Sequence, residues 1–243
     1  MSVRTFLHFL IKEKMIESSP FLETKSPRQP AHSLLLLKDK DYKKLLTVLK
    51  RDALLQAPKS VRDWCLFLLL GELALKASEA ANLSFGQILE FSELNSNRQE
   101  DFGYIKVPGE KTRHLPLSKE IRQAFHLLKK ARQALGLSTG KDAKLFFALS
   151  DIRKTVHSDF LHRHGIKFII YGISEKILGV PYNAESLRNR AIKSWLENGL
   201  EKEKVAELAG YSSLNSLERF YVKKSSDFRL PRRQLSKIGK DAS

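Results

Sequence analysis

The sequence is poor in cysteine, which limits the kinds of protein it can encode. Cys65 is the single cysteine among 243 residues. One cysteine excludes both an intramolecular disulfide framework and a cysteine-rich zinc site. Glycine and proline are also few, with 12 and 8 residues, whereas hydrophobic residues make up 42%. This composition predicts a folded chain with a substantial core.

The chain also lacks a long apolar run. The most apolar stretch, Trp64 to Leu75, is too short to cross a bilayer and contains Glu72. Residues 12–14 are charged and no small-residue cleavage site follows them, so we expect no signal peptide. No zinc-finger spacing, GxxxxGK[ST] loop or GxGxxG turn occurs. We therefore expect a cytoplasmic protein without cofactor, metal ion or membrane contact.

Acidic residues are in short supply. The sequence has 43 Lys+Arg against 27 Asp+Glu, a formal net charge of +16. Residues 1–100 hold 15 basic and 12 acidic residues, whereas residues 101–243 hold 28 and 15. Such a surface concentrates polyanions, so nucleic acid is the first partner to consider and a membrane surface the second. The positive second half favours a groove for a polyanion.

Hydrophobic periodicity predicts an α+β protein that is mostly α-helical with one small antiparallel sheet. An amphipathic helix is expected over 2–16, followed by a proline-containing linker. We expect an N-terminal segment (1–33), a main domain (34–222) and a basic tail (223–243). Within the main domain, the almost entirely apolar helix over 59–73 should be central and buried. The other predicted elements are a hairpin over 102–117 and helices beginning near Asp39 or Asp41 and over 78–83, 118–135, 153–163, 167–177, 184–198, 201–209 and 213–222.

Three segments of the main domain carry a recognisable pattern: 68–88 (LLLGELALKASEAANLSFGQI), 104–118 (YIKVPGEKTRHLPLS) and 182–221, which includes ESLR and LAGY. In order and spacing they resemble the tyrosine recombinases, the family of phage integrases and Xer-like proteins. That family shares a G-L-R-x-S-E-like segment, a basic hairpin ending in Pro-Leu, an H-x-L-R box, an L-G-H turn and a nucleophilic tyrosine. The resemblance covers roughly 34–222 and implies the family's catalytic-domain fold.

The resemblance implies a reaction on double-stranded DNA without a metal ion. A tyrosine hydroxyl attacks a phosphodiester and keeps the phosphate as phosphotyrosine, which conserves the bond energy for rejoining. Arginines suit the transition state because a guanidinium donates two bonds to one phosphate. A lysine protonates the leaving oxygen, and histidines assist. Residues 2–33 resemble the last helix and linker of the family's N-terminal core-binding domain, most of which would then be missing.

Several residues match the family pattern. Arg188, in the box ESLR, stands where the second family arginine stands, and Glu79 matches the acidic residue after the first arginine. Lys111 lies in the hairpin that carries the family's catalytic lysine. Its offset from the closing proline is shorter than usual, and Pro108 is nearer the family position. Lys106, on the preceding strand, is therefore a rival candidate.

Other positions depart from the pattern. Lys76 replaces the first arginine, which keeps the charge but loses the bidentate geometry. Glu185 replaces the histidine of the H-x-L-R box, and Tyr211 replaces that of the L-G-H turn. All seven histidines lie at or before His164, so none stands in these boxes.

The nucleophile position also departs. The family spacing from the L-G-H turn falls on Phe220, and Tyr221 comes one residue late. One residue rotates a helical side chain by about 100°. Tyr221 would therefore take the place of the nucleophile only if its helix began at a shifted position.

Three hypotheses remain. In the first, the chain is a recombinase with six catalytic positions: Tyr221 as nucleophile, Arg188 and Lys76 as phosphate clamp, Lys111 as general acid, and Glu185 and Tyr211 as accessory groups. In the second, the fold only binds DNA or a partner recombinase. In the third, it is a decayed gene product. Losing one transition-state donor costs about 3 kcal/mol, so Lys76 and Glu185 together favour weak or lost cleavage. In any active form we expect it to assemble on DNA as a homo-oligomer or with a partner recombinase.

Overall fold

The computed structural model describes residues 3–19, 21, 36–89, 103–149 and 155–221. The chain divides into two compact units, Met1–Ser33 and Leu34–Ser243. The first contains helix α1 (Val3–Lys12), in which no residue is buried. Its apolar residues recur at helical spacing, as predicted, and Val3, Phe6 and Phe9 are exposed. The helix ends before residue 16, because Lys14 adopts a positive φ of 56°.

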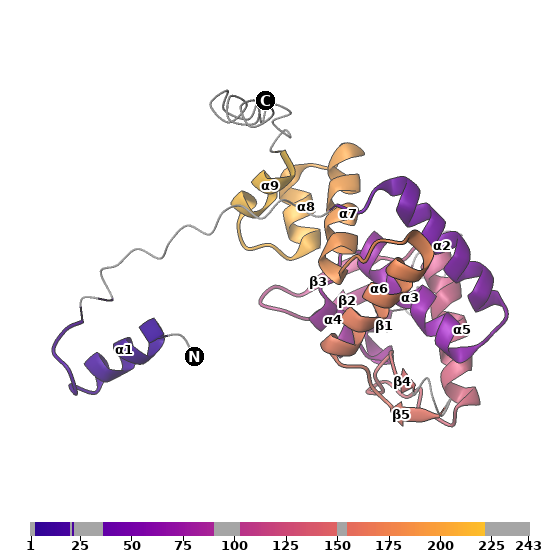
Figure 1. Cartoon of the computed structure of the whole chain (residues 1–243), viewed down its shortest axis with the longest axis horizontal. Coiled ribbons are helices and arrows are strands. Elements are labelled where there is room, and N and C mark those ends of the chain that lie inside the picture. The colour runs from indigo at the N-terminus through magenta and orange to yellow at the C-terminus, as the bar shows by residue number, and fades with distance from the viewer. Residues whose placement is uncertain (1–2, 20, 22–35, 90–102, 150–154, 222–243) are drawn as a thin grey trace, which may run out of the picture. The chain divides into compact units, whose positions relative to one another are not determined.

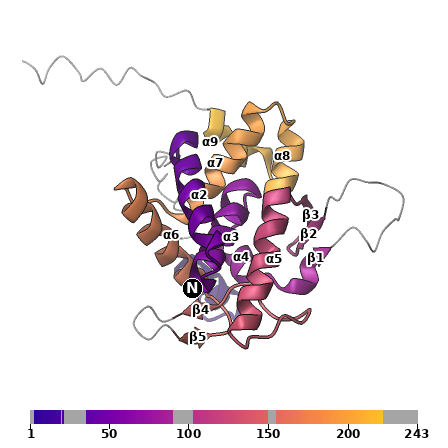
Figure 2. The same cartoon turned by 90° about the vertical axis from the view of Figure 1, so that its right-hand side faces the viewer.

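Helix α3 (Pro58–Glu72) forms the centre of the second unit, as the sequence predicted. Proline is favoured in the first turn, where its missing N–H has no helical partner. Every residue from Val61 to Gly71 is buried. Its most extensive contacts are with α2 (Asp39–Leu54), α5 (Lys119–Ala134) and α7 (Ala184–Glu197), and their arrangement is seen in Figure 1 and Figure 2.

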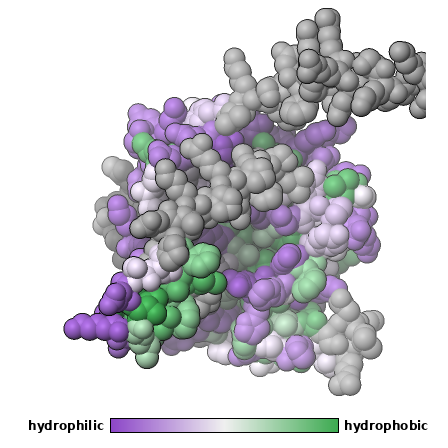
Figure 3. All heavy atoms as spheres, turned by 60° about the vertical axis from the view of Figure 1, so that its left-hand side comes forward, coloured by the Kyte–Doolittle hydropathy of each residue, from purple (hydrophilic) through white to green (hydrophobic). Residues whose placement is uncertain are grey.

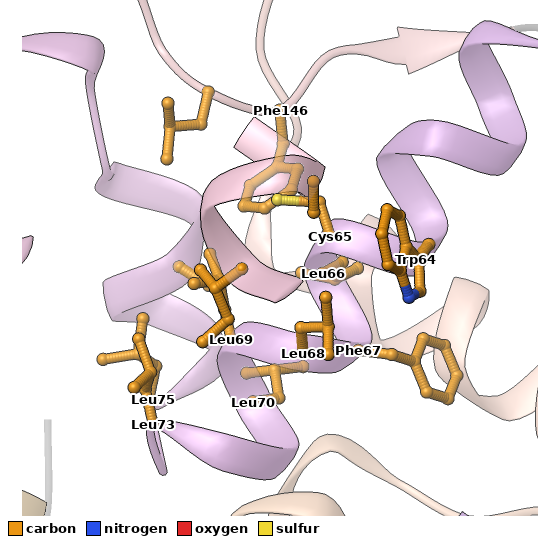
Figure 4. Close-up of a cluster of buried hydrophobic side chains, with 14 of the residues drawn as sticks. Trp64, Cys65, Leu66, Phe67, Leu68, Leu69, Leu70, Leu73, Leu75 and Phe146 are labelled. Atoms are coloured by element: carbon orange, nitrogen blue, oxygen red, sulfur yellow. The ribbon is translucent and has the colours of Figure 1, made fainter. Parts of the chain in front are cut away.

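The core around α3 is continuous and apolar (Figure 4). Trp64, Cys65 and Phe67 from α3 and Phe146 from a later loop are all buried. Burial raises the pKa of the Cys65 thiol far above its ordinary value. A Cβ at Gly71 would lie 2.4 Å from the Tyr42 ring, so glycine is what allows α2 and α3 to approach this closely.

A three-stranded antiparallel sheet lies beside these helices. It comprises β1 (Ile88–Leu89), β2 (Tyr104–Val107) and β3 (Arg113–Pro116), in the order β1-β2-β3. Strands β2 and β3 form the predicted hairpin, with Tyr104 opposite Pro116 and Val107 opposite Arg113. Alternate residues of both strands are buried, as a half-buried sheet requires. Helix α5 follows, with the Ser118 hydroxyl accepting the Ile121 N–H at 3.2 Å.

The helix predicted over 167–177 is confirmed, but the helix predicted over 153–163, whose first two positions lie outside the described residues, was wrong. The structure has strand β5 (Val156–Ser158), paired antiparallel with β4 (Ala148–Leu149), and then one continuous helix, α6 (Arg163–Leu178). A run of three residues carries too little periodicity to distinguish strand from helix, and pairing with β4 decides. Gly179 ends α6 at a φ of 72°.

The last elements form a second, smaller cluster. Helix α8 (Lys202–Ala209), a 3₁₀ turn (Leu214–Leu217) and the one-turn helix α9 (Glu218–Tyr221) follow α7. Their buried residues meet Ala74 at the end of α3. Figure 1 and Figure 2 both show α7, α8 and α9 at one end of the second unit and the β4–β5 sheet at the other.

The fold is therefore mostly helical with antiparallel pairing, as predicted, and the described residues form two small sheets where one was expected. Hydrophilic side chains prevail on the face drawn in Figure 3, and apolar side chains form local patches there. None of the helices in the described part of the chain is long and apolar enough to cross a membrane.

Candidate functional site

Arg188 joins three segments of the second unit. It lies in the second turn of α7, which begins where the Asn183 side chain accepts the Ser186 N–H at 2.8 Å. Its Nη1 donates to the backbone oxygen of Ala74, and its Nη2 donates to that of Ala209 at 2.6 Å. Only 5% of the residue is exposed. The guanidinium thus ties α7 to the end of α3 and the end of α8.

The charge environment of Arg188 follows from this burial. Burial lowers the pKa of its guanidinium, while the Tyr211 phenol and the Glu79 carboxylate act in the opposite sense. The guanidinium carbon lies 5.2 Å from the centre of the Tyr211 ring. Arginine remains cationic in proteins, so Arg188 places a positive charge next to that ring.

Arg113 and Glu79 form an ion pair beside Arg188, in which the side chain of Arg113 is buried and that of Glu79 is partly buried. The Arg113 Nη1 donates to Glu79 Oε1 at 3.1 Å, and its Nη2 donates to Oε2 at 2.7 Å. Oε2 also accepts the backbone N–H of Lys76 at 2.8 Å, at the start of helix α4 (Ala77–Asn82). A Cβ at Gly210 would lie 2.4 Å from Arg113 Nη1. The Arg113–Glu79 pair therefore joins the β2–β3 hairpin to α4 and to the turn after α8.

Burial alone raises the pKa of Glu79. The hydrogen bonds from Arg113 and from the Lys76 N–H, together with the charges of Arg113 and Arg188, outweigh this and hold the pKa of Glu79 below its ordinary value. Glu79 is therefore an ionised, structural carboxylate at neutral pH.

A second arginine, Arg219, lies near the Tyr211 phenol. Its Nη2 donates to Tyr211 Oη at 2.7 Å and to Asn189 Oδ1 at 3.1 Å. Its Nη1 donates to Glu185 Oε1 at 3.2 Å. Arg219 precedes α9's last two residues and Glu185 opens α7, so this network joins the two helices.

These residues surround a pocket of about 620 Å³, which we call the basic pocket. Five basic side chains line it: Lys76, Arg163, Lys167, Arg188 and Arg219. Tyr211 and His164 also line it, and Glu185 is the one carboxylate among its lining residues. Among the residues that the structure describes, no group of His, Cys, Asp and Glu could hold a metal ion. The pocket suits an anion such as a phosphate.

Comparison with known proteins identifies the family. The model of the phage integrase family matches residues 36–227, which is most of the second unit. The chain belongs to the phage integrase family.

Three similar proteins show how far the likeness extends. The tyrosine recombinase XerC of Bacillus subtilis (strain 168) is 25% identical over 219 residues, which cover 89% of this chain. This chain spans about two thirds of that relative's length, 66%. The crystal structure of XerA recombinase has a TM-score of 0.58 at 17% identity, covering 97% of this chain and 72% of that chain. The XerH site-specific recombinase bound to its difH substrate gives 0.58 at 17% identity, with coverages of 84% and 53%. The two structures share the fold.

Four of the six residues expected at a phage integrase site meet in the basic pocket: Lys76, Glu185, Arg188 and Tyr211. They come from the loop before α4, from α7 and from the turn after α8, far apart in sequence. The pocket is thus assembled where the family boxes lie, including the boxes in which the usual arginine and histidines are absent.

Lys111 and Tyr221 do not line this pocket. Lys111 is exposed in the turn of the hairpin, and Lys106 is exposed on β2. Tyr221 is 47% exposed, and the Lys202 Nζ lies 4.5 Å from its ring centre. Phe220, at the family spacing of the nucleophile, packs partly buried against the second cluster. Tyr221 therefore lies outside the basic pocket.

The structure adds four residues that the sequence patterns missed. Arg163, His164 and Lys167 come from the first turns of α6, and Arg219 comes from α9. All seven histidines precede the ESLR box in sequence, yet α6 packs against α4 and brings His164 to the pocket. The spacing of three residues between His164 and Lys167 would have placed both on one face of a helix. The predicted break between residues 163 and 167 prevented that inference.

Proposed function

We propose that this chain binds double-stranded DNA with its basic pocket and takes part in site-specific recombination or integration of DNA. The observation that carries the proposal is the convergence of five basic side chains on one pocket that includes Arg188. Lysine and arginine neutralise DNA phosphates and release their counterions, which supplies most sequence-independent affinity. The net charge of +16 also favours binding to DNA.

The proposed reaction forms a bond between a tyrosine oxygen and phosphorus and breaks the bond from phosphorus to the 5′ oxygen of the next nucleotide. Arg188 and Lys76 would stabilise the charge on the non-bridging oxygens. Lys111 would protonate the leaving oxygen, and Glu185 and Tyr211 would occupy accessory positions. Cleavage by Tyr221 requires α9 to shift, since this tyrosine lies outside the basic pocket.

A second candidate is a DNA-binding module that does not cleave, or a partner of an active recombinase. The position of Phe220 favours it, because an apolar ring packs where the family spacing places the nucleophile. The exposed positions of Lys111 and Tyr221 favour it as well. A decayed gene product is the third alternative.

A nicked duplex that traps covalent intermediates separates these candidates. Protein-DNA adducts that resist denaturation in wild type and disappear in Tyr221→Phe would support cleavage by Tyr221. Salt-sensitive binding without any adduct would support the non-cleaving module. Failure to bind duplex DNA even at low salt would refute both and leave the decayed gene product.

We also propose that the protein acts in the cytoplasm, as several copies or with a partner recombinase on the DNA. Strand exchange joins two duplexes, so one pocket alone does not suffice for it. Mass photometry of the protein with and without duplex DNA would test this. Complexes that never exceed one copy would refute the assembly.

A further inference from the structure

The ion pair between Glu185 and Arg219 places a carboxylate inside the pocket proposed to receive a phosphate. Arg219 Nη1 donates to Glu185 Oε1 at 3.2 Å, and both residues line the basic pocket. The pair is open to solvent, with side-chain exposures of 38% for Arg219 and 62% for Glu185. Ion pairs this exposed contribute little to stability. Stability therefore does not account for an acidic group at this place.

The other amino group of Arg219 is anchored independently of Glu185. Its Nη2 donates to Tyr211 Oη at 2.7 Å and to Asn189 Oδ1 at 3.1 Å. Asn189 is buried, with 4% exposed, so packing restricts the movement of its side chain. A planar guanidinium fixed at one nitrogen stays oriented when the partner of the other nitrogen changes. Nη1 is thus free to exchange one anion for another.

A donor such as Arg219 Nη1 would add to the phosphate-binding groups of the basic pocket. Arg188 already donates to two backbone oxygens. Lys76 is a point charge that lacks the planar fork of the arginine usual at this family position. Guanidinium groups bind carboxylates and phosphates in the same forked geometry. Arg219 Nη1, which donates to Glu185 Oε1, is therefore already placed to donate to a phosphate oxygen instead of that carboxylate.

We infer that Glu185 is an internal mimic of a DNA phosphate. In the free protein its carboxylate holds Arg219 Nη1, and on binding a backbone phosphate replaces that carboxylate while Glu185 turns to solvent. Arg219 then binds the phosphate with its guanidinium, and Asn189 is a positioning residue that acts through it. This inference rests on the proposed DNA-binding function.

Salt-dependent DNA binding by the full chain tests the inference. The probe is a short fluorescein-labelled duplex of arbitrary sequence, and anisotropy gives its Kd between about 50 and 200 mM salt. Arg219→Gln removes the guanidinium and its positive charge. Its control, Arg51→Gln, removes the same charge from an exposed pair with Asp52 on α2. Glu185→Gln releases Arg219, and its control is Glu207→Gln, in an exposed pair on α8. Neither control residue lines the pocket.

We expect Arg219→Gln to lower the slope of log Kd against log salt by about 0.9, the value for one phosphate contact. Arg51→Gln should leave the slope unchanged. Glu185→Gln should bind the duplex about two- to fivefold more tightly, since an exposed pair no longer has to be broken. Glu207→Gln should not. The gain should shrink in the double variant Glu185→Gln/Arg219→Gln, which has no guanidinium to release.

Equal slopes for wild type and Arg219→Gln, or no gain in Glu185→Gln beyond its control, would overturn the inference and leave the proposed function standing. Absence of binding by wild type at low salt would instead refute the proposed function. Melting temperatures show which variants are folded. Glu185 is exposed, so its variant carries the test if Arg219→Gln proves unstable.

Discussion

Replacing Glu79 by glutamine should destabilise the fold more than any ordinary change of surface charge. The substitution keeps the size of the side chain but removes the charge that faces Arg113, whose side chain is only 5% exposed. Breaking a buried ion pair from one side costs about 3–5 kcal/mol, because the remaining charge is left uncompensated. We expect a loss of about 3 kcal/mol in the free energy of unfolding, the lower end of that range, since glutamine keeps one acceptor oxygen.

The effect should depend on pH in a defined direction. The folded-state pKa of Glu79 lies below its ordinary value of 4.5. A carboxyl of this kind stabilises the fold above its unfolded-state pKa and loses this contribution as the pH falls through its folded-state pKa. The difference between wild type and Glu79→Gln should therefore be full near neutral pH and shrink as the pH falls below 4.5.

Urea unfolding followed by circular dichroism at several pH values measures both quantities. Glu207→Gln is the matched control, because it removes the same charge from an exposed pair with Lys204 at 2.9 Å. Its loss should stay within about 1 kcal/mol. If Glu79→Gln costs no more than this control, or if its effect does not vary with pH, the buried pair does not stabilise the fold as argued.

Further substitutions test the rest of the site. Arg188→Met should lower the free energy of unfolding by at least about 2 kcal/mol, since two backbone oxygens each lose a charged donor; urea unfolding would contradict this if the midpoint stayed unchanged. Tyr221→Phe should change duplex affinity by less than about 0.5 kcal/mol, the range of surface substitutions, because Tyr221 lies outside the basic pocket; a tenfold loss in an anisotropy titration would show that Tyr221 itself contacts the DNA. Gly210→Ala should lower the free energy of unfolding by more than about 1 kcal/mol, because the φ of Gly210 is 67° and an added Cβ would meet Arg113. Gly172→Ala in α6, with open space around its Cβ, should instead raise it by about 0.5–1 kcal/mol. Thermal unfolding that ranks the two variants the other way would refute this account of the turn at Gly210.

Local sequence patterns predicted most of the fold. The apolar run over 59–73 and the alternation around the Pro108-Gly109 turn each lie within one element, so periodicity alone identified α3 and the hairpin. It failed at residues 156–158, because so short a strand is specified by pairing with β4 and not by its own residues. Helix α6 was predicted over 167–177, but its start at Arg163 was missed for the same reason.

The candidate site was predictable only where family boxes exist. Those boxes pointed to Arg188 and Lys76, which do share a pocket. They could not reveal Arg219, whose partner Glu185 lies 34 residues earlier, nor that His164 reaches the pocket through the packing of α6. Such contacts depend on how helices dock, and a linear motif carries no information on docking.

The buried thiol of Cys65, in α3, can be used to measure how often the core of the protein opens. Cys65 is wholly shielded from solvent, and its high pKa keeps it in the unreactive thiol form. A maleimide should therefore label it only during opening of the core, so that the labelling rate measures how often the native state opens. Since it is also the single cysteine of the chain, cysteines introduced at the pocket rim would accept fluorophores selectively, without removal of the native one.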